Sequence, residues 1–123
     1  MAKLVIWIDF DPSGSTLSPS MIRLLEAIHK HGTIRRAAAE SGMSYRKAWL
    51  LLQQTQKTFK GPVVNAGAGG HAGGGTQLTD LGVEVLTLYR AAVKHSSVAA
   101  QGNLETLTKL VRHDAPPRRT QRS

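Results

Sequence analysis

The 123-residue sequence contains no cysteine and only six aromatic residues. The absence of cysteine excludes a disulfide scaffold, a thiolate metal site and a cysteine nucleophile, and it fits a reducing compartment. Because aromatic residues are few, the core must be aliphatic. No apolar run approaches the roughly 20 residues that span a membrane, and the short apolar stretch at residues 4–8 is soon followed by acids, unlike a signal peptide. We therefore expect one cytoplasmic domain with short extensions and no membrane partner.

Patterns that indicate catalysis or cofactor binding are also missing from the sequence. His29 and His31 are two residues apart, so they diverge on a helix, and the other histidines are scattered. We find no carboxylate pair, nucleophile elbow or Ser/His/Asp order. The sequence predicts no enzyme, no catalytic residue, no cofactor and no metal site.

Acidic residues are few, and the formal net charge is +8. Residues 23–60 contain eight basic residues against two acidic ones, residues 76–114 are balanced, and the last nine residues add three arginines. A basic surface concentrated in one segment attracts a polyanion. The charge distribution thus favours a nucleic-acid partner over a merely soluble basic protein.

Capping residues divide the first half of the chain into three helices. Serine or threonine marks each start, and glycine marks the ends of the first two. The helices run from Ser18-Pro19 to Gly32, from Thr33 to Ser41-Gly42, and from Ser44 to about Phe59. A short middle helix joined to the next by a glycine turn is typical of a helix-turn-helix.

Extended segments flank these helices. Apolar and polar residues alternate over residues 3–10, which predicts an N-terminal strand, and residues 11–15 have the composition of a loop. Val63-Val64 and Thr76-Gln77-Leu78 enclose a glycine-rich segment. We interpret it as a hairpin with a long tip, a wing, and the alternative is a disordered linker.

Thr79 caps a fourth, long helix that runs to about Ser97. The predicted fold class is therefore mainly α with small β: a winged helix-turn-helix over residues 1–100, made of an N-terminal strand, three helices, a glycine-rich wing hairpin and a long C-terminal helix. Residues 101–114 form a helical extension, and residues 115–123 form a disordered basic tail.

The predicted DNA contacts follow from helix-turn-helix docking, in which the second helix enters the major groove and the preceding helix crosses the backbone. Ser44, Arg46 and Lys47 are expected to contact bases or phosphates. Trp49 either covers the core edge or stacks on sugar and bases, and His71 either enters the minor groove or lies in solvent. The predicted DNA-binding residues are Thr33, Arg35, Arg36, Ser44, Tyr45, Arg46, Lys47, Trp49, Gly70 and His71.

The fourth helix has apolar residues on more than one side, because Leu86 and Val93 lie off its main stripe. A second copy of the chain is one explanation, since helix-turn-helix proteins commonly dimerise to match two half-sites. The alternative is that the N-terminal strand or residues 104–111 fold over it. The predicted dimerisation residues are Leu81, Val85, Leu88, Tyr89 and Ala92.

Several motifs within residues 4–95 occur in a specific combination. They are Leu24-Leu25-Glu26-Ala27-Ile28, Gly32-Thr33-Ile34-x-x-Ala37-Ala38, Gly42-Met43-Ser44-Tyr45-x-x-Ala48-Trp49, the glycines from Gly69 to Gly75, and Leu78-Thr79-x-x-Gly82. Together they resemble the N-terminal DNA-binding domain of molybdate-responsive ModE-type regulators, which is related to the winged helix of LysR-type regulators.

This resemblance implies a homodimeric transcriptional regulator that binds double-stranded operator DNA through the third helix and the wing. ModE-type proteins also carry C-terminal molybdate-binding domains, for which the residues after the match are too few. We therefore expect a DNA-binding module without that domain. Its expected partners are double-stranded DNA, a second copy of the chain and a separate sensor protein. A protein-interaction or adaptor module without DNA binding is the alternative, because a fold does not determine a function.

Overall fold

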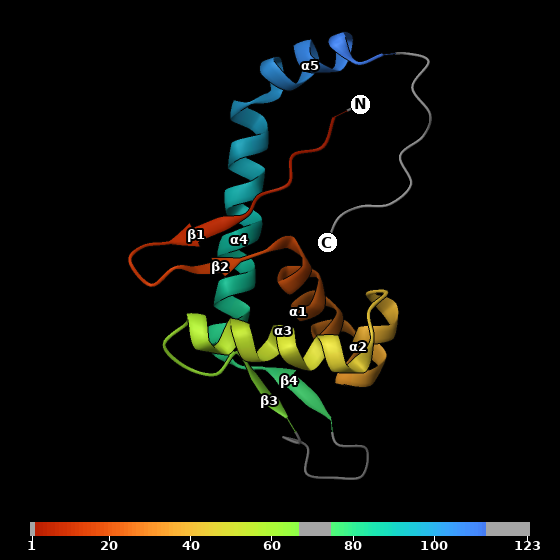
Figure 1. Ribbon diagram of the computed structural model, residues 1–123, viewed down its shortest axis with the longest axis vertical. Helices are drawn as coiled ribbons and strands as arrows, with labels where there is room; N and C mark the ends of the chain where they lie inside the picture. The colour runs from red at the N-terminus through yellow and green to blue at the C-terminus, as the bar shows by residue number, and fades with distance from the viewer. Residues whose placement is uncertain (1, 67–74, 113–123) are drawn as a thin grey trace.

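The computed structural model describes residues 2–66 and 75–112. Its elements are β1 (Ile8–Phe10), β2 (Ser15–Leu17), α1 (Pro19–His31), α2 (Ile34–Glu40), α3 (Tyr45–Thr58), β3 (Val64–Ala66), β4 (Thr76–Leu78), α4 (Asp80–Ala99) and α5 (Gln101–Leu110). Figure 1 shows α1, α2 and α3 packed together at one end, and α4 extending away from them toward α5. The predicted fold class, mainly α with small β in a winged-helix arrangement, is confirmed.

Within residues 2–66 and 75–112, helices α1 to α4 start with side-chain caps where the sequence predicts them. Ser18, Thr33, Ser44 and Thr79 each accept a hydrogen bond from the backbone N–H three residues later. Each cap satisfies one of the donors that a first helical turn leaves free. Helix α1 ends at Gly32, whose φ of 80° lies in the left-handed region that glycine adopts without steric cost.

The core is aliphatic, as predicted, and lies between the first three helices and the near half of α4. Small side chains occupy the contacts of α2 with α1 and α3, which lets the helices approach closely. The most deeply buried apolar residues are Leu24, Leu25, Ile28, Ala37, Ala38, Ala48, Leu52 and Val63.

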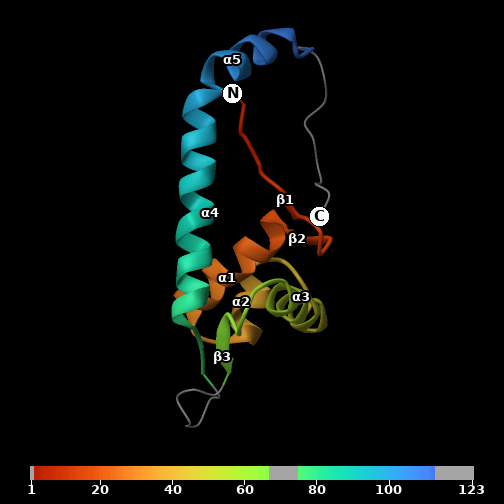
Figure 2. The ribbon, with the colours of Figure 1, turned by 90° about the vertical axis from the view of Figure 1, so that its left-hand side faces the viewer.

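Two antiparallel hairpins lie on opposite sides of α3, as Figures 1 and 2 both show. In the first, β1 pairs with β2 in the register Ile8 to Leu17. In the second, β3 pairs with β4 in the register Val64 to Leu78. The second hairpin is the base of the predicted wing.

The N-terminal strand is shorter than the sequence predicts. Residues 3–7 alternate between half-buried and exposed, as expected, but only Ile8–Phe10 form a strand. The reason is that β2 is only three residues long and therefore pairs with three residues of β1. Sequence analysis missed β2, because Ser15 belongs to the loop predicted at residues 11–15, and Thr16 and Leu17 are too short a run to show alternation.

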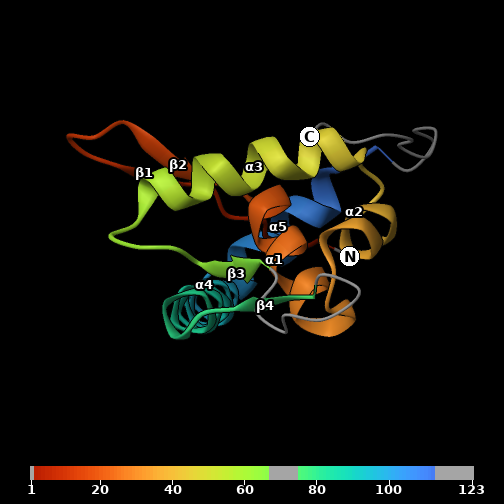
Figure 3. The same ribbon diagram turned by 90° about the horizontal axis from the view of Figure 1, so that it is seen from below.

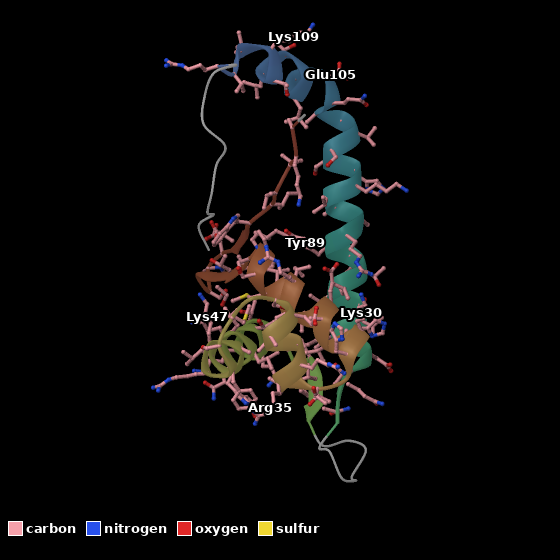
Figure 4. All side chains as sticks on the ribbon, turned by 90° about the vertical axis from the view of Figure 1, so that its right-hand side faces the viewer. Lys30, Arg35, Lys47, Tyr89, Glu105 and Lys109 are labelled. Carbon is pink, nitrogen blue, oxygen red and sulfur yellow. The ribbon has the colours of Figure 1, made fainter. Side chains whose placement is uncertain are left out.

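Helix α4 is covered on one side by the N-terminal segment. The hydroxyl of Tyr89 donates a 2.6 Å hydrogen bond to the carbonyl oxygen of Ile6, and Figure 4 shows Tyr89 on the side of α4 that faces this segment. Leu86 is buried, and Val93 packs partly against the core. The N-terminal segment therefore covers part of the apolar surface that the sequence shows on this helix.

Candidate nucleic-acid interface

The turn between α2 and α3 determines how α3 is presented. Gly42 has a φ of 72°, and the backbone N–H of Met43 donates a 3.0 Å hydrogen bond to the carbonyl oxygen of Ala38. The hydroxyl of Ser44 then accepts a 3.0 Å hydrogen bond from the backbone N–H of Lys47. These local bonds hold the first turn of α3 against the end of α2, as a helix-turn-helix requires.

One face of α3 is buried and the opposite face is exposed. Ala48, Leu52 and Thr55 point into the core. With 3.6 residues per turn, Arg46 and Leu50 lie on the opposite side, and both are exposed. Figure 3 shows α3 along one edge of the molecule, with neither α1 nor α4 outside it. The outer face of α3 is therefore open to a groove of nucleic acid.

The basic residues of α2 and α3 that are predicted to contact DNA lie at this end of the molecule. Arg35, Arg36, Arg46 and Lys47 are exposed, and within residues 2–66 and 75–112 none of them forms a salt bridge. Figure 4 shows Arg35 and Lys47 on the three-helix end, far from α5. Positive charges that no acid neutralises attract phosphate groups.

An aromatic pair links the start of α2 to the first turns of α3. The guanidinium carbon of Arg35 lies 4.7 Å from the centroid of the Tyr45 ring, within the range of a cation–π contact. The rings of Tyr45 and Trp49 meet edge to face, with centroids 6.2 Å apart. Both aromatic residues remain exposed. The three side chains thus orient one another on the surface where the sequence predicts DNA contacts.

The wing is tied to the helices by hydrogen bonds at both of its strands. The side-chain oxygen of Gln56 on α3 accepts bonds from the backbone N–H groups of Val63, at 2.9 Å, and Val64, at 3.3 Å. On the other strand, the N–H of Thr76 donates a 2.8 Å bond to the carbonyl oxygen of Gly32. These contacts fix the wing relative to α3.

The base of the wing packs tightly against the start of α4. The hydroxyl of Thr79 donates a 2.7 Å hydrogen bond to the carbonyl oxygen of Pro62. Its backbone N–H donates a 3.0 Å hydrogen bond to the carbonyl oxygen of Val63. The same hydroxyl accepts a 3.0 Å bond from the N–H of Gly82. A Cβ atom at Gly82 would overlap the Val63 carbonyl oxygen. This close approach explains the motif Leu78-Thr79-x-x-Gly82.

The structure brings most of the predicted DNA-binding residues to one end of the molecule. Thr33 and Ser44 cap α2 and α3, and the remaining helical residues of the predicted set are exposed. Gly70 and His71 lie outside the described residues. The set stays a prediction.

Sequence analysis missed three residues of this region. Leu50 and Gln53 are exposed on α3, and the helical period of the buried residues was the signal that would have found them. No sequence signal identifies Gln56, because its partners lie seven and eight residues away and are placed by the fold.

The described parts of the chain contain no cluster of three or more His, Asp or Glu side chains placed to hold a metal ion. No helix among them has the length and apolarity that a membrane span needs.

No protein-family model matches the sequence, but known proteins are similar to part of it. The chain is 46% identical to the molybdenum transport protein ModE of Azotobacter vinelandii over 78 residues, which are 63% of this chain and 29% of that protein. It is 48% identical to the molybdenum-pterin-binding protein MopA of Rhodobacter capsulatus over 61 residues, 50% of this chain and 23% of that protein. It is 34% identical to the DNA-binding transcriptional dual regulator ModE of Escherichia coli K12 over 71 residues, 58% of this chain and 27% of that protein.

The chain spans less than a third of the length of these relatives. The matches to the two proteins named ModE cover more than half of this chain. The resemblance to ModE-type regulators that the sequence motifs predict is thereby confirmed.

Proposed function

We propose that this chain binds double-stranded DNA and regulates transcription in the manner of ModE-type regulators. The observation that carries this proposal is the exposed N-terminal half of α3, where Arg46 and Lys47 stand without acidic partners among the described residues. Helix α3 is capped, held by a helix-turn-helix and flanked by a wing. The Escherichia coli relative is named as a DNA-binding transcriptional dual regulator, which supports the same function.

In this proposal α3 lies in the major groove. Ser44, Tyr45, Arg46 and Lys47 contact base edges or phosphates, because the N-terminal residues of a recognition helix reach deepest. Arg35 and Arg36 contact the phosphates beside the groove, with Thr33 at the start of α2. The wing, with Gly70 and His71, follows the adjacent backbone or minor groove.

We also propose that the chain binds DNA as a homodimer, which presents two recognition helices to two half-sites. Helix α5 buries none of its residues in its own protomer, and Figure 1 shows it projecting beyond the domain. Of the residues predicted for dimerisation, Val85 and Tyr89 are buried in the protomer, Leu81 and Ala92 are half-buried, and Leu88 is exposed. The surface we propose for the second copy is therefore the exposed set Leu88, Val98, Leu107, Leu110 and Val111.

The regulated genes, in this proposal, serve molybdenum metabolism, because relatives are named for molybdenum transport and molybdenum-pterin binding. We assign no molybdate site to the winged helix. The oxyanion is sensed outside it, in another domain or a separate protein, and the winged helix transmits the result to cytoplasmic DNA.

The test is a mobility-shift assay with random and candidate duplexes at two salt concentrations. The parent protein is expected to bind at low salt and to lose affinity steeply as salt rises, because phosphate contacts release counterions. The double variant Arg46→Ala/Lys47→Ala is expected to lose binding while its circular dichroism and melting temperature stay unchanged, since both side chains are exposed.

The matched control is Lys94→Ala/Lys109→Ala, which removes two exposed charges from α4 and α5. It is expected to retain binding. Equal binding by the Arg46/Lys47 variant and the parent would show that the assignment of α3 is wrong. No binding of the parent to any duplex at low salt would favour the adaptor function.

A further inference from the structure

The outer face of α3 has an apolar residue at its centre. Residues 50–52 are three consecutive leucines, and the helix turns them in different directions. Leu52 is 1% exposed and Leu51 is half-buried, whereas Leu50 is 52% exposed. Leu50 therefore takes no part in the core of its own protomer.

The neighbours of Leu50 on this face are polar and exposed. Arg46 lies one turn before it, and Gln53 and Gln54 lie one turn after it. Leu50 is in the second turn of α3, whose first residue is Tyr45. The N-terminal turns of a recognition helix are the part that reaches base edges.

Arginine and glutamine can recognise guanine and adenine through paired hydrogen bonds, but leucine has no hydrogen-bonding group. The edges of the bases offer one apolar group in the major groove, the 5-methyl of thymine. We infer that Leu50 contacts a thymine methyl group and so makes each half-site favour thymine at a defined position. This inference rests on the proposed function, and it adds one element of sequence specificity to it.

The expected size of the effect follows from the burial of one carbon group. Removing a buried methyl changes an association constant about fourfold. Uracil differs from thymine only in lacking this methyl, so it keeps every hydrogen-bonding group of the base edge. A thymine-to-uracil replacement therefore isolates the proposed contact.

The experiment starts from duplexes selected from a random pool by the full 123-residue protein. Each thymine is then replaced singly by uracil, and affinity is measured by fluorescence anisotropy. We expect about fourfold weaker binding at one position in each half-site. The variant Leu50→Ala is expected to bind the thymine and uracil duplexes equally, and its fold is expected to be intact because Leu50 is exposed.

The matched control is Val5→Ala, which shortens another exposed aliphatic side chain, beside α1 and α4. It is expected to retain the preference for thymine. Equal binding of all uracil duplexes by the parent, or a preference for thymine that survives in Leu50→Ala, would overturn the inference while leaving DNA binding established. If the pool yields no bound duplex, the proposed function fails and this inference fails with it, and an exposed Leu50 would then point to a protein partner.

Discussion

The side-chain oxygen of Gln56 lies 2.9 Å from the backbone nitrogen of Val63, and this hydrogen bond joins the last turn of α3 to the start of the wing. Val63 is fully buried, so its N–H has no access to water. A buried donor that loses its acceptor keeps its full desolvation penalty. The orientation of the wing relative to α3 therefore depends on this glutamine.

Replacing Gln56 by leucine is expected to lower the free energy of unfolding by about 1–3 kcal/mol, because Val63 N–H is left without an acceptor. Gln56→Glu keeps an acceptor oxygen of the same reach, so its free energy of unfolding is expected to fall by less. Urea unfolding followed by circular dichroism measures both. Equal urea midpoints for Gln56→Leu and the parent would show that the bond contributes nothing to stability.

Gly82→Ala is expected to destabilise the protein strongly. The added Cβ would overlap the carbonyl oxygen of Val63, which is backbone and also accepts the Thr79 N–H bond, so neither can move cheaply. A loss of about 1–3 kcal/mol or more is expected, as for overpacking in a core. The melting temperature and the unfolding free energy provide the measurement.

Gly102→Ala is the matched control, because Gly102 is also helical but has open space around its Cβ position. Alanine is the better helix former by roughly 1 kcal/mol, so this variant should be neutral or more stable. If both glycine variants behaved alike, the contact between Gly82 and Val63 would not be the cause.

The features that sequence analysis predicted are the ones encoded by neighbouring residues. Ser18, Thr33, Ser44 and Thr79 cap helices by bonding a backbone group three residues away, so each cap is visible in a short window. Gly42 likewise marks its turn locally. The helix-turn-helix could therefore be placed from the sequence alone.

The missed features of the fold depend on contacts between distant segments. The three-residue strand β2 exists only because β1 pairs with it. The covering of α4 by the N-terminal segment was one of two alternatives from the sequence, and the bond between Tyr89 and Ile6 that decides it joins residues 83 positions apart. In the candidate site, Arg46 and Lys47 were predicted from their charge, whereas Leu50, which has no charge, was not predicted. Leu50 depends on no distant contact, since the helical period of the buried residues of α3 places it on the outer face.

Tyr89 is expected to make stability depend on alkaline pH. Its burial raises the pKa of its hydroxyl, and the charge of Glu26 adds to the rise. A folded-state pKa above the unfolded value of about 10 means that the stabilisation is complete below that pH and is lost as the pH rises through the folded pKa. Unfolding free energies measured between about pH 8 and pH 11 should fall for the parent.

The variant Tyr89→Phe removes both the titrating group and the 2.6 Å bond to Ile6. It should be less stable than the parent by about 1 kcal/mol near neutral pH. Its stability should also decline less between the two pH values, since the other titrating groups are shared. Parallel pH profiles for the two proteins would contradict the role given to Tyr89.

Helix α5 provides the test of the proposed homodimer. Leu107 is 57% exposed and Leu110 is 75% exposed. A two-fold symmetric contact would bury both leucines of each protomer. A charge in an apolar contact costs several kcal/mol, so Leu107→Asp/Leu110→Asp is expected to sediment as a monomer where the parent sediments as a dimer. Its helix content should be unchanged, because neither leucine is buried in the protomer.

The control is Val5→Asp, which places an acid at another exposed apolar site and should remain dimeric. A parent that sediments as a monomer at tens of micromolar, or a double variant that remains a dimer, would show that these leucines do not form the interface.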